Sequence, residues 1–195
     1  MKLNHAVMLA TFTLLFADAA SASILWHESI NGDLSNSSSA PTTLPALTLG
    51  PNRIVGSIGA WWSSDDGDVA TFTVPPGFLL SNVILESYND MVYYDYVPFI
   101  LYRGASTSGQ EIEFILFGEQ NVGTDLLDFD SKPGPQPAGD YTFRFHNIET
   151  DNITDERSTY TVNLTLSEVP EPATLSLLAF GGLVGIGRRA LAKRW

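Results

Sequence analysis

The chain contains no cysteine among its 195 residues. This absence removes disulfide bonds as a source of stability, so the hydrophobic core or bound ions must supply it. It also excludes thiol catalysis and zinc sites built from cysteine.

Basic residues are scarce. Ten Lys and Arg stand against 22 Asp and Glu, which gives a formal net charge of -12. The imbalance is larger between residues 23 and 168, where five basic residues stand against 20 acidic ones, a formal charge of -15. Such a surface repels nucleic acid and anionic lipid, and it suits divalent cations. We therefore expect no nucleic-acid partner.

Sequence motifs of the common enzyme classes are missing. The chain has no Gly-x-Ser-x-Gly, no Gly-rich phosphate loop and no His-Glu-x-x-His. After residue 22 it has two histidines, His27 and His146. Glu111 and Glu113 share one strand face, but hydrolysis by paired carboxylates depends on a separation that sequence alone does not give. This inventory favours a protein that is not an enzyme.

Between residues 23 and 168 the apolar residues alternate with polar ones, and no sustained helical period is present. Tyr141-Thr142-Phe143-Arg144-Phe145-His146 places three aromatic residues on one face, as in a half-buried strand. Pro75-Pro76-Gly77 is a turn, and 131–139 contains three prolines, which excludes a strand interior. Residues 31–48 are expected to form a loop or a loosely attached first strand. The strands are predicted at 54–58, 69–74, 80–88, 98–102, 112–117, 141–146 and 160–166.

We therefore predict an all-β fold, an antiparallel β-sandwich of jelly-roll-like or immunoglobulin-like topology with about seven strands. Its core is expected to bury Phe72, Phe143, Phe145, Val162 and Leu164 together. The sandwich should span residues 23–168. A signal helix is expected before it and a hydrophobic helix after it.

The N-terminus has the pattern of a secretory signal peptide. Lys2 and His5 precede the apolar run 6–16, and Ala20-Ser21-Ala22 forms a small-x-small cleavage site. We expect export through the Sec machinery and cleavage before Ser23, with residues 1–22 as the signal peptide.

The C-terminus carries three elements in a fixed order. Val169-Pro170-Glu171-Pro172 is extended, because proline disfavours helix. Residues 173–187 carry no charge, and Arg188, Arg189, Lys193 and Arg194 follow, as the positive-inside rule requires of a cytoplasmic end. The uncharged run is shorter than the ~20 residues that span a bilayer, and extending it to 192 includes two arginines. The segment is therefore marginal as a permanent anchor and suitable as a transient one.

This tail resembles the PEP-CTERM sorting signal of bacterial envelope proteins. The resemblance implies that residues 169–195 form the signal, with a membrane helix at about 173–192 in the inner membrane, and that an exosortase recognises it. A plain C-terminal membrane anchor has the same topology and stays open as the alternative.

The body of the chain resembles a bacterial pre-peptidase C-terminal type domain over most of residues 28–166. The motifs are Glu28 with Gly32-Asp33-Leu34-Ser35, 55–59, Asp65-Asp66-Gly67-Asp68, 74–77 and 137–143. Such domains are jelly-roll-like sandwiches, and relatives bind collagen or polysaccharide, some with calcium.

Asp65, Asp66 and Asp68 are the best candidates for chemistry. Calcium takes six to eight oxygen ligands, and three carboxylates around Gly67 supply part of such a shell. The resemblance implies that Glu28 and Asp33 complete it. A solvated acidic turn is the competing interpretation. A second acidic stretch, at Asp125, Asp128 and Asp130, has the spacing of a partly buried turn, and a metal site there is the less favoured alternative.

Trp61 and Trp62 adjoin the acidic loop. Exposed indole rings form a stacking platform for sugars. The plainer interpretation is that one of the two tryptophans anchors the core and the other covers it from a loop.

Two hypotheses follow for the protein. It is a non-enzymatic envelope or extracellular-matrix component that an exosortase sorts, or it is a carbohydrate- or calcium-binding module, with exopolysaccharide as the partner, that the tail delivers to the cell surface.

Overall fold

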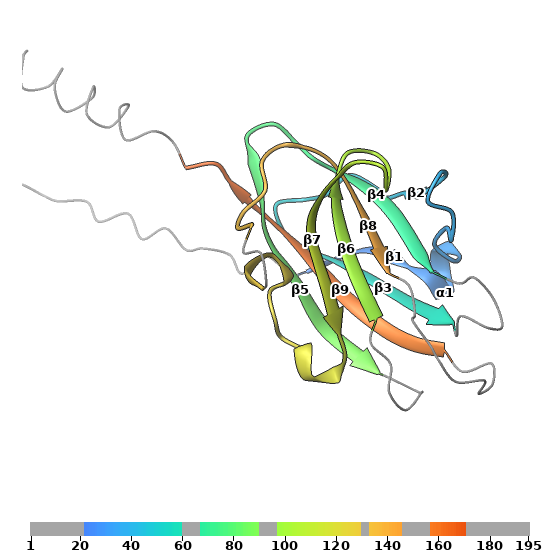
Figure 1. The fold of residues 1–195 in the computed structure, drawn as a ribbon. Helices are drawn as coiled ribbons and strands as arrows, with labels where there is room; N and C mark the ends of the chain where they lie inside the picture. The colour runs from blue at the N-terminus through green and yellow to red at the C-terminus, as the bar shows by residue number, and fades with distance from the viewer. Residues whose placement is uncertain (1–21, 60–66, 90–96, 130–132, 146–156, 171–195) are drawn as a thin grey trace, which may run out of the picture.

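The computed structural model describes residues 22–59, 67–89, 97–129, 133–145 and 157–170 (Figure 1). The predicted signal helix and C-terminal helix lie outside these ranges. Within them, no helix is long and apolar enough to cross a bilayer. The elements in chain order are β1 (Ser23–His27), α1 (Glu28–Asn31), β2 (Thr42–Thr43), β3 (Gly50–Gly59), β4 (Asp68–Val74), β5 (Phe78–Asn89), β6 (Val97–Arg103), β7 (Gln110–Phe117), the short 3₁₀ turns η1 (Glu119–Asn121) and η2 (Leu126–Asp128), β8 (Gly139–Phe145) and β9 (Arg157–Glu168).

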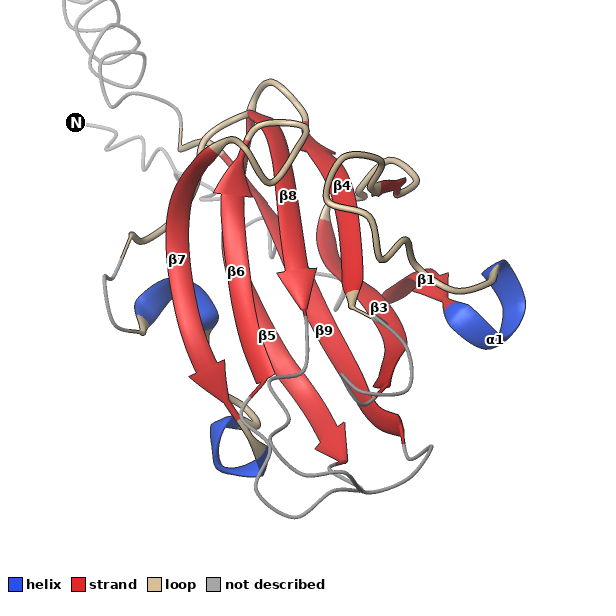
Figure 2. Cartoon of the chain, turned by 45° about the vertical axis from the view of Figure 1, so that its right-hand side comes forward, coloured by secondary structure: helices blue, strands red, loops and turns tan. Residues whose placement is uncertain are grey.

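The strands form two sheets, which confirms the predicted all-β sandwich. One sheet has the order β1-β3-β9-β5, and the other has the order β2-β4-β8-β6-β7. In Figure 2 the second sheet lies in front of the first. Each of the seven strand segments predicted from alternation falls on one of the strands β3 to β9; His146, at the end of one of them, lies outside the described residues.

The edges differ from the antiparallel prediction. β1 pairs with β3 in parallel, and β2 pairs with β4 in parallel. Parallel pairing requires a long connection between the two strands, and residues 28–49 and 44–67 supply one in each case. The predicted loose first strand within 31–48 is thus a two-residue edge strand, β2.

The core lies between the two sheets. Phe72, Phe143 and Phe145 from one sheet and Val162 and Leu164 from the other are each at most 2% exposed, as the alternation predicted. Phe145 stacks on Tyr160 across the sandwich, with ring centroids 4.5 Å apart. Burial of each such side chain contributes about 1.5–3 kcal/mol, so this core is the main source of stability in a domain without disulfides.

The strand directions give the sandwich two distinct ends. β4, β6 and β9 finish at one end, where β5, β7 and β8 begin, because these neighbours pair antiparallel. β1 begins at this end too, since Ser23 pairs with Asn52 and Asn52 pairs with Leu164 near the end of β9. We call this end the tail pole, because the C-terminal segment leaves from it; the turns that belong to it lie at the top of Figure 2.

Candidate functional site

The C-terminal segment leaves the sandwich immediately after β9. Glu168 ends the strand and pairs with Phe78, and the Val169 N–H donates to the Gly77 carbonyl at 3.0 Å. Val169 and Pro170 are exposed. The remaining residues predicted for the sorting signal, Glu171, Pro172, Arg188 and Arg189, lie outside the described residues. The predicted motif therefore begins one residue after a hydrogen-bonded strand.

Three of the five predicted metal ligands lie together. Oxygen atoms of Glu28, Asp33 and Asp68 are all within 4.8 Å of one another. Glu28 is the first residue of α1, Asp33 follows the helix, and Asp68 is the first residue of β4. Asp65 and Asp66 lie outside the described residues. The structure thus brings together the two acidic residues that the family resemblance implied and one residue of the acidic loop.

Glu28 is held by the neighbouring strand. Its Oε2 accepts hydrogen bonds from the Ser57 N–H at 2.7 Å and the Ser57 hydroxyl at 3.0 Å. Its Oε1 accepts a long bond, 3.5 Å, from the Leu34 N–H. Burial raises the pKa of the Glu28 carboxyl, and the charge of Asp33 adds to the rise, whereas the bonds from Ser57 oppose it. The position of this carboxylate is therefore fixed, and its charge is costly in the absence of a cation.

Asp68 is fully buried, and its Oδ2 accepts a 2.6 Å hydrogen bond from the Tyr160 hydroxyl. Burial raises the pKa of Tyr160 well above its ordinary value, and the charge of Asp68 acts in the same direction. Tyr160 pairs across the sheet with Gly56, where an added Cβ would overlap its hydroxyl. Gly56 therefore makes room for the ring that positions Asp68.

Sequence analysis missed two members of this cluster, Ser57 and Tyr160. Tyr160 appears in the sequence as a core residue of an alternating strand, and Ser57 as a polar residue in another. The register of β3 with β9 places Tyr160 opposite Gly56, and the pairing of β1 with β3 brings Glu28 to Ser57. The motif Gly56-Ser57 is the sequence signal that could have identified them, because a glycine inside a strand often marks a close approach.

The donor set fits a calcium ion in its chemistry. All of its charged groups are carboxylate oxygens, which calcium prefers. Two oxygens bound to one calcium ion at 2.3–2.6 Å are at most about 4.6–5.2 Å apart, and the observed separations are within 4.8 Å. The cluster supplies three of the six to eight ligands that calcium takes, so further oxygens from the chain or water would be needed.

The second acidic stretch has a structural role. Asp125 Oδ1 accepts from the N–H groups of Val83 and Leu127, and its Oδ2 accepts from Asn82 at 2.6 Å. Asp125 thus joins β5 to η2, and Asp128 is exposed. Asp130 lies outside the described residues. The interpretation as a partly buried turn fits the geometry at Asp125.

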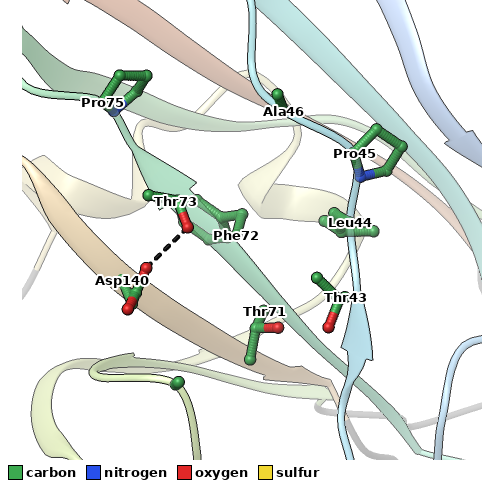
Figure 3. Close-up of a pocket in the computed structure, with 10 residues that line it drawn as sticks. Thr43, Leu44, Pro45, Ala46, Thr71, Phe72, Thr73, Pro75 and Asp140 are labelled. Atoms are coloured by element: carbon green, nitrogen blue, oxygen red, sulfur yellow. Dashed lines mark hydrogen bonds between the residues drawn. The ribbon is translucent and has the colours of Figure 1, made fainter.

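A hollow of about 430 Å³ opens at the tail pole (Figure 3). Phe72, the aromatic residue of its lining, is 2% exposed and stacks on Tyr141. On one side Thr73 donates a hydrogen bond to Asp140 at 2.7 Å. Because the Phe72 side chain is only 2% exposed, it offers a sugar no accessible ring face. The residues predicted for sugar stacking, Trp61 and Trp62, lie outside the described residues. The lining consists of Thr43, Leu44, Pro45, Ala46, Thr71, Phe72, Thr73, Pro75, Ala105 and Asp140.

Comparison with known proteins identifies the tail. Residues 168–194 match the family model of the PEP-CTERM protein-sorting motif. The chain thus carries a PEP-CTERM sorting signal, which marks an exported protein that an exosortase processes at the membrane. Searches of curated proteins and of solved structures returned no match. The resemblance of residues 28–166 to a pre-peptidase C-terminal type domain stays a prediction.

Proposed function

We propose that the protein is a non-enzymatic component of the cell envelope or extracellular matrix, cut by an exosortase near Pro170-Glu171-Pro172 and released to the cell surface. One observation carries the proposal: the matched sorting motif begins at Glu168, the last residue of the final strand. Cleavage just beyond it would release a complete sandwich.

The absence of enzyme motifs from the sequence supports a non-catalytic role. A serine–histidine hydrogen bond joins the Ser29 hydroxyl to Nδ1 of His27 at 2.9 Å. His27 ends β1 and Ser29 lies in α1, neither residue lines the hollow, and Ser29 is exposed. The pair is a contact between residues two positions apart in the chain at the start of α1.

Intact-mass measurement of the exported protein tests the processing. In a host with an exosortase we expect a species that begins near Ser23 and has lost Trp195. Glu171→Ala should retain the tail, and Glu119→Gln, at an exposed acidic residue on η1 outside the matched motif, should be processed normally. A wild-type product that keeps Trp195 in such a host would show a plain anchor instead.

A second function, calcium binding, is favoured by the cluster of Glu28, Asp33 and Asp68. Folding brings together the acidic side chains of a domain with a formal charge of -15, and their mutual repulsion destabilises the folded state. One bound divalent ion would relieve part of that repulsion. Because ligand binding to the native state stabilises by RT ln(1 + [L]/Kd), calcium at ~100 times Kd would add about 2.7 kcal/mol.

Thermal unfolding of the exported protein in EDTA, in calcium and in magnesium tests this function. We expect calcium alone to raise the unfolding temperature. Asp33→Asn should abolish the rise, and Asp128→Asn, an exposed acidic residue on η2, should leave it intact. Equal shifts with both ions would mean that the cations only screen charge, and the cluster would be an acidic turn.

A further inference from the structure

Both ends of the sandwich lie at the tail pole. β9 ends there at Glu168, and β1 begins there at Ser23, beside β3. The turns that join strands at this end are 75–77 between β4 and β5 and 104–109 between β6 and β7. Residues 133–138 lead into β8 at the same end, where Gln136 bridges to Leu80. Residues 45–50 lead into β3 there.

The connections of this pole carry no charge. Segments 45–50, 75–77, 104–109 and 133–138 consist of Pro, Gly, Ala, Ser, Thr, Leu and Gln. The charged side chains at the strand ends here are Arg103, Glu111, Asp140 and Glu168. By sequence, the connections 60–66, 90–96 and 146–156, which join strand ends at the opposite pole, contain eight acidic residues and no Lys or Arg. The sandwich is therefore polarised along its strands.

Apolar side chains are exposed at the tail pole. Leu49 is 53% exposed and Val169 is 46% exposed, and Ile24, the second residue of β1, is 62% exposed. Pro76, Pro135 and Pro137 are also exposed. The hollow described above opens at the same pole. Four other apolar side chains are exposed away from this pole, namely Ile30, Phe114, Leu116 and Val122, so apolar exposure alone does not set the tail pole apart. Its uncharged turns do, and such a surface tolerates a bilayer interface, whereas the acidic rest of the domain repels an anionic one.

The tether between this pole and the apolar run is short. Four peptide units separate Val169 from Ala173, and at ~3.3–3.6 Å per residue they span at most about 14 Å. Val169 is itself fixed by its bond to Gly77. A strand of seven residues such as β8 places the opposite pole ~23 Å farther away, beyond the ~8 Å Debye length at physiological salt. Acidic residues there would feel little repulsion from anionic lipid.

We propose that, while the tail is held in the bilayer, the tail pole lies against the lipid headgroup surface of the inner membrane and the acidic pole points away from it. The inference rests on the proposed membrane-held tail. In this orientation the uncharged turns form the surface that faces the membrane. The sorting motif then lies between the sandwich and the membrane, within reach of a membrane enzyme.

Site-specific fluorescence on the full chain tests this orientation, and the lack of native cysteine makes each single-cysteine variant report one site. Ser108→Cys labels the turn of the tail pole, and Ser87→Cys labels an exposed serine near the opposite end of β5. Each labelled chain is inserted into vesicles of phosphatidylethanolamine and phosphatidylglycerol. Quenching by a nitroxide on the lipid headgroup and by aqueous iodide is then measured.

We expect headgroup quenching to be at least threefold stronger at position 108 than at position 87, with iodide quenching weaker by a similar factor. Equal quenching at the two positions in chains that have inserted overturns the orientation and leaves the sorting function intact. Protection of position 108 only after exosortase is added also overturns it, because the contact would then be with protein. A chain that does not sediment with vesicles refutes the membrane-held tail and, with it, this proposal.

Discussion

The substitution Gly56→Ala tests how β3 and β9 position the acidic cluster. A Cβ at residue 56 would lie 2.5 Å from Cζ of Tyr160 and would overlap its hydroxyl. The Tyr160 ring is 1% exposed and stacks on Phe145, so it has no space to move into. The added methyl group must therefore displace the ring or separate two paired strands.

The expected cost has two parts. Overpacking of a buried site costs about 1–3 kcal/mol. Loss of the hydrogen bond from Tyr160 to the Asp68 carboxylate adds about 1.5–3 kcal/mol, because the acceptor is a buried group. We expect Gly56→Ala to destabilise the domain by about 3–5 kcal/mol, a large part of the ~5–15 kcal/mol that a domain has in total.

Chemical denaturation in urea, followed by far-UV circular dichroism, measures this cost. Gly118→Ala is the matched control, because its Cβ would meet only the end of the flexible Gln120 side chain, and it should change stability by less than about 0.5 kcal/mol. In the background of Tyr160→Leu, which removes the outer ring atoms, Gly56→Ala should become nearly neutral. An equal cost in both backgrounds would refute the steric argument.

Three further predictions concern the core, a buried amide and the cluster. Phe143→Ala should cost about 3–5 kcal/mol in the same denaturation measurement, since Phe143 is 1% exposed and contacts the rings of Phe72 and Phe145; a change below 1 kcal/mol would place the core elsewhere. Asn52→Ala should cost about 3 kcal/mol or more, because the fully buried Asn52 amide donates to the carbonyls of Thr48, Gly50 and Leu164, and Asn52→Asp should not rescue it. Burial raises the pKa of the Glu28 carboxyl above 4.5, so the folded state binds the carboxyl proton more tightly than the unfolded state does. The contribution of Glu28 to stability is therefore fully present below pH 4.5, and it is lost as the pH rises through the pKa of the folded state. Glu28→Gln should flatten this decline in stability between pH 4.5 and 7 without calcium, and an unchanged pH profile would contradict it.

Alternation of apolar and polar residues was sufficient to predict the strands β3 to β9, because a half-buried strand repeats every two residues whatever its partner. Val69 to Val74 and Tyr160 to Leu166 show this directly, and their inward residues form the core. The tail could also be identified from sequence, because its three elements act through composition and order. A sorting motif is recognised as an extended segment, so its meaning does not depend on a fold.

Other features depend on the register between distant strands. Glu28 and Asp68 are 40 residues apart, and their approach required the parallel edge strand β1 beside β3, which alternation does not predict. Asp125 could have been a metal ligand by sequence, but its hydrogen bonds to Val83 and Leu127 make it a link between β5 and η2.

The sequence by itself determined the fold class, the core residues and the sorting tail, since each depends on local pattern or composition. The tertiary structure alone decided that Tyr160 holds Asp68, that Gly56 leaves room for this ring, and that β1 begins and β9 ends at one pole whose connecting turns carry no charge. These depend on which strands pair and in which register, and the free energy of pairing is set by contacts between residues that the sequence keeps far apart.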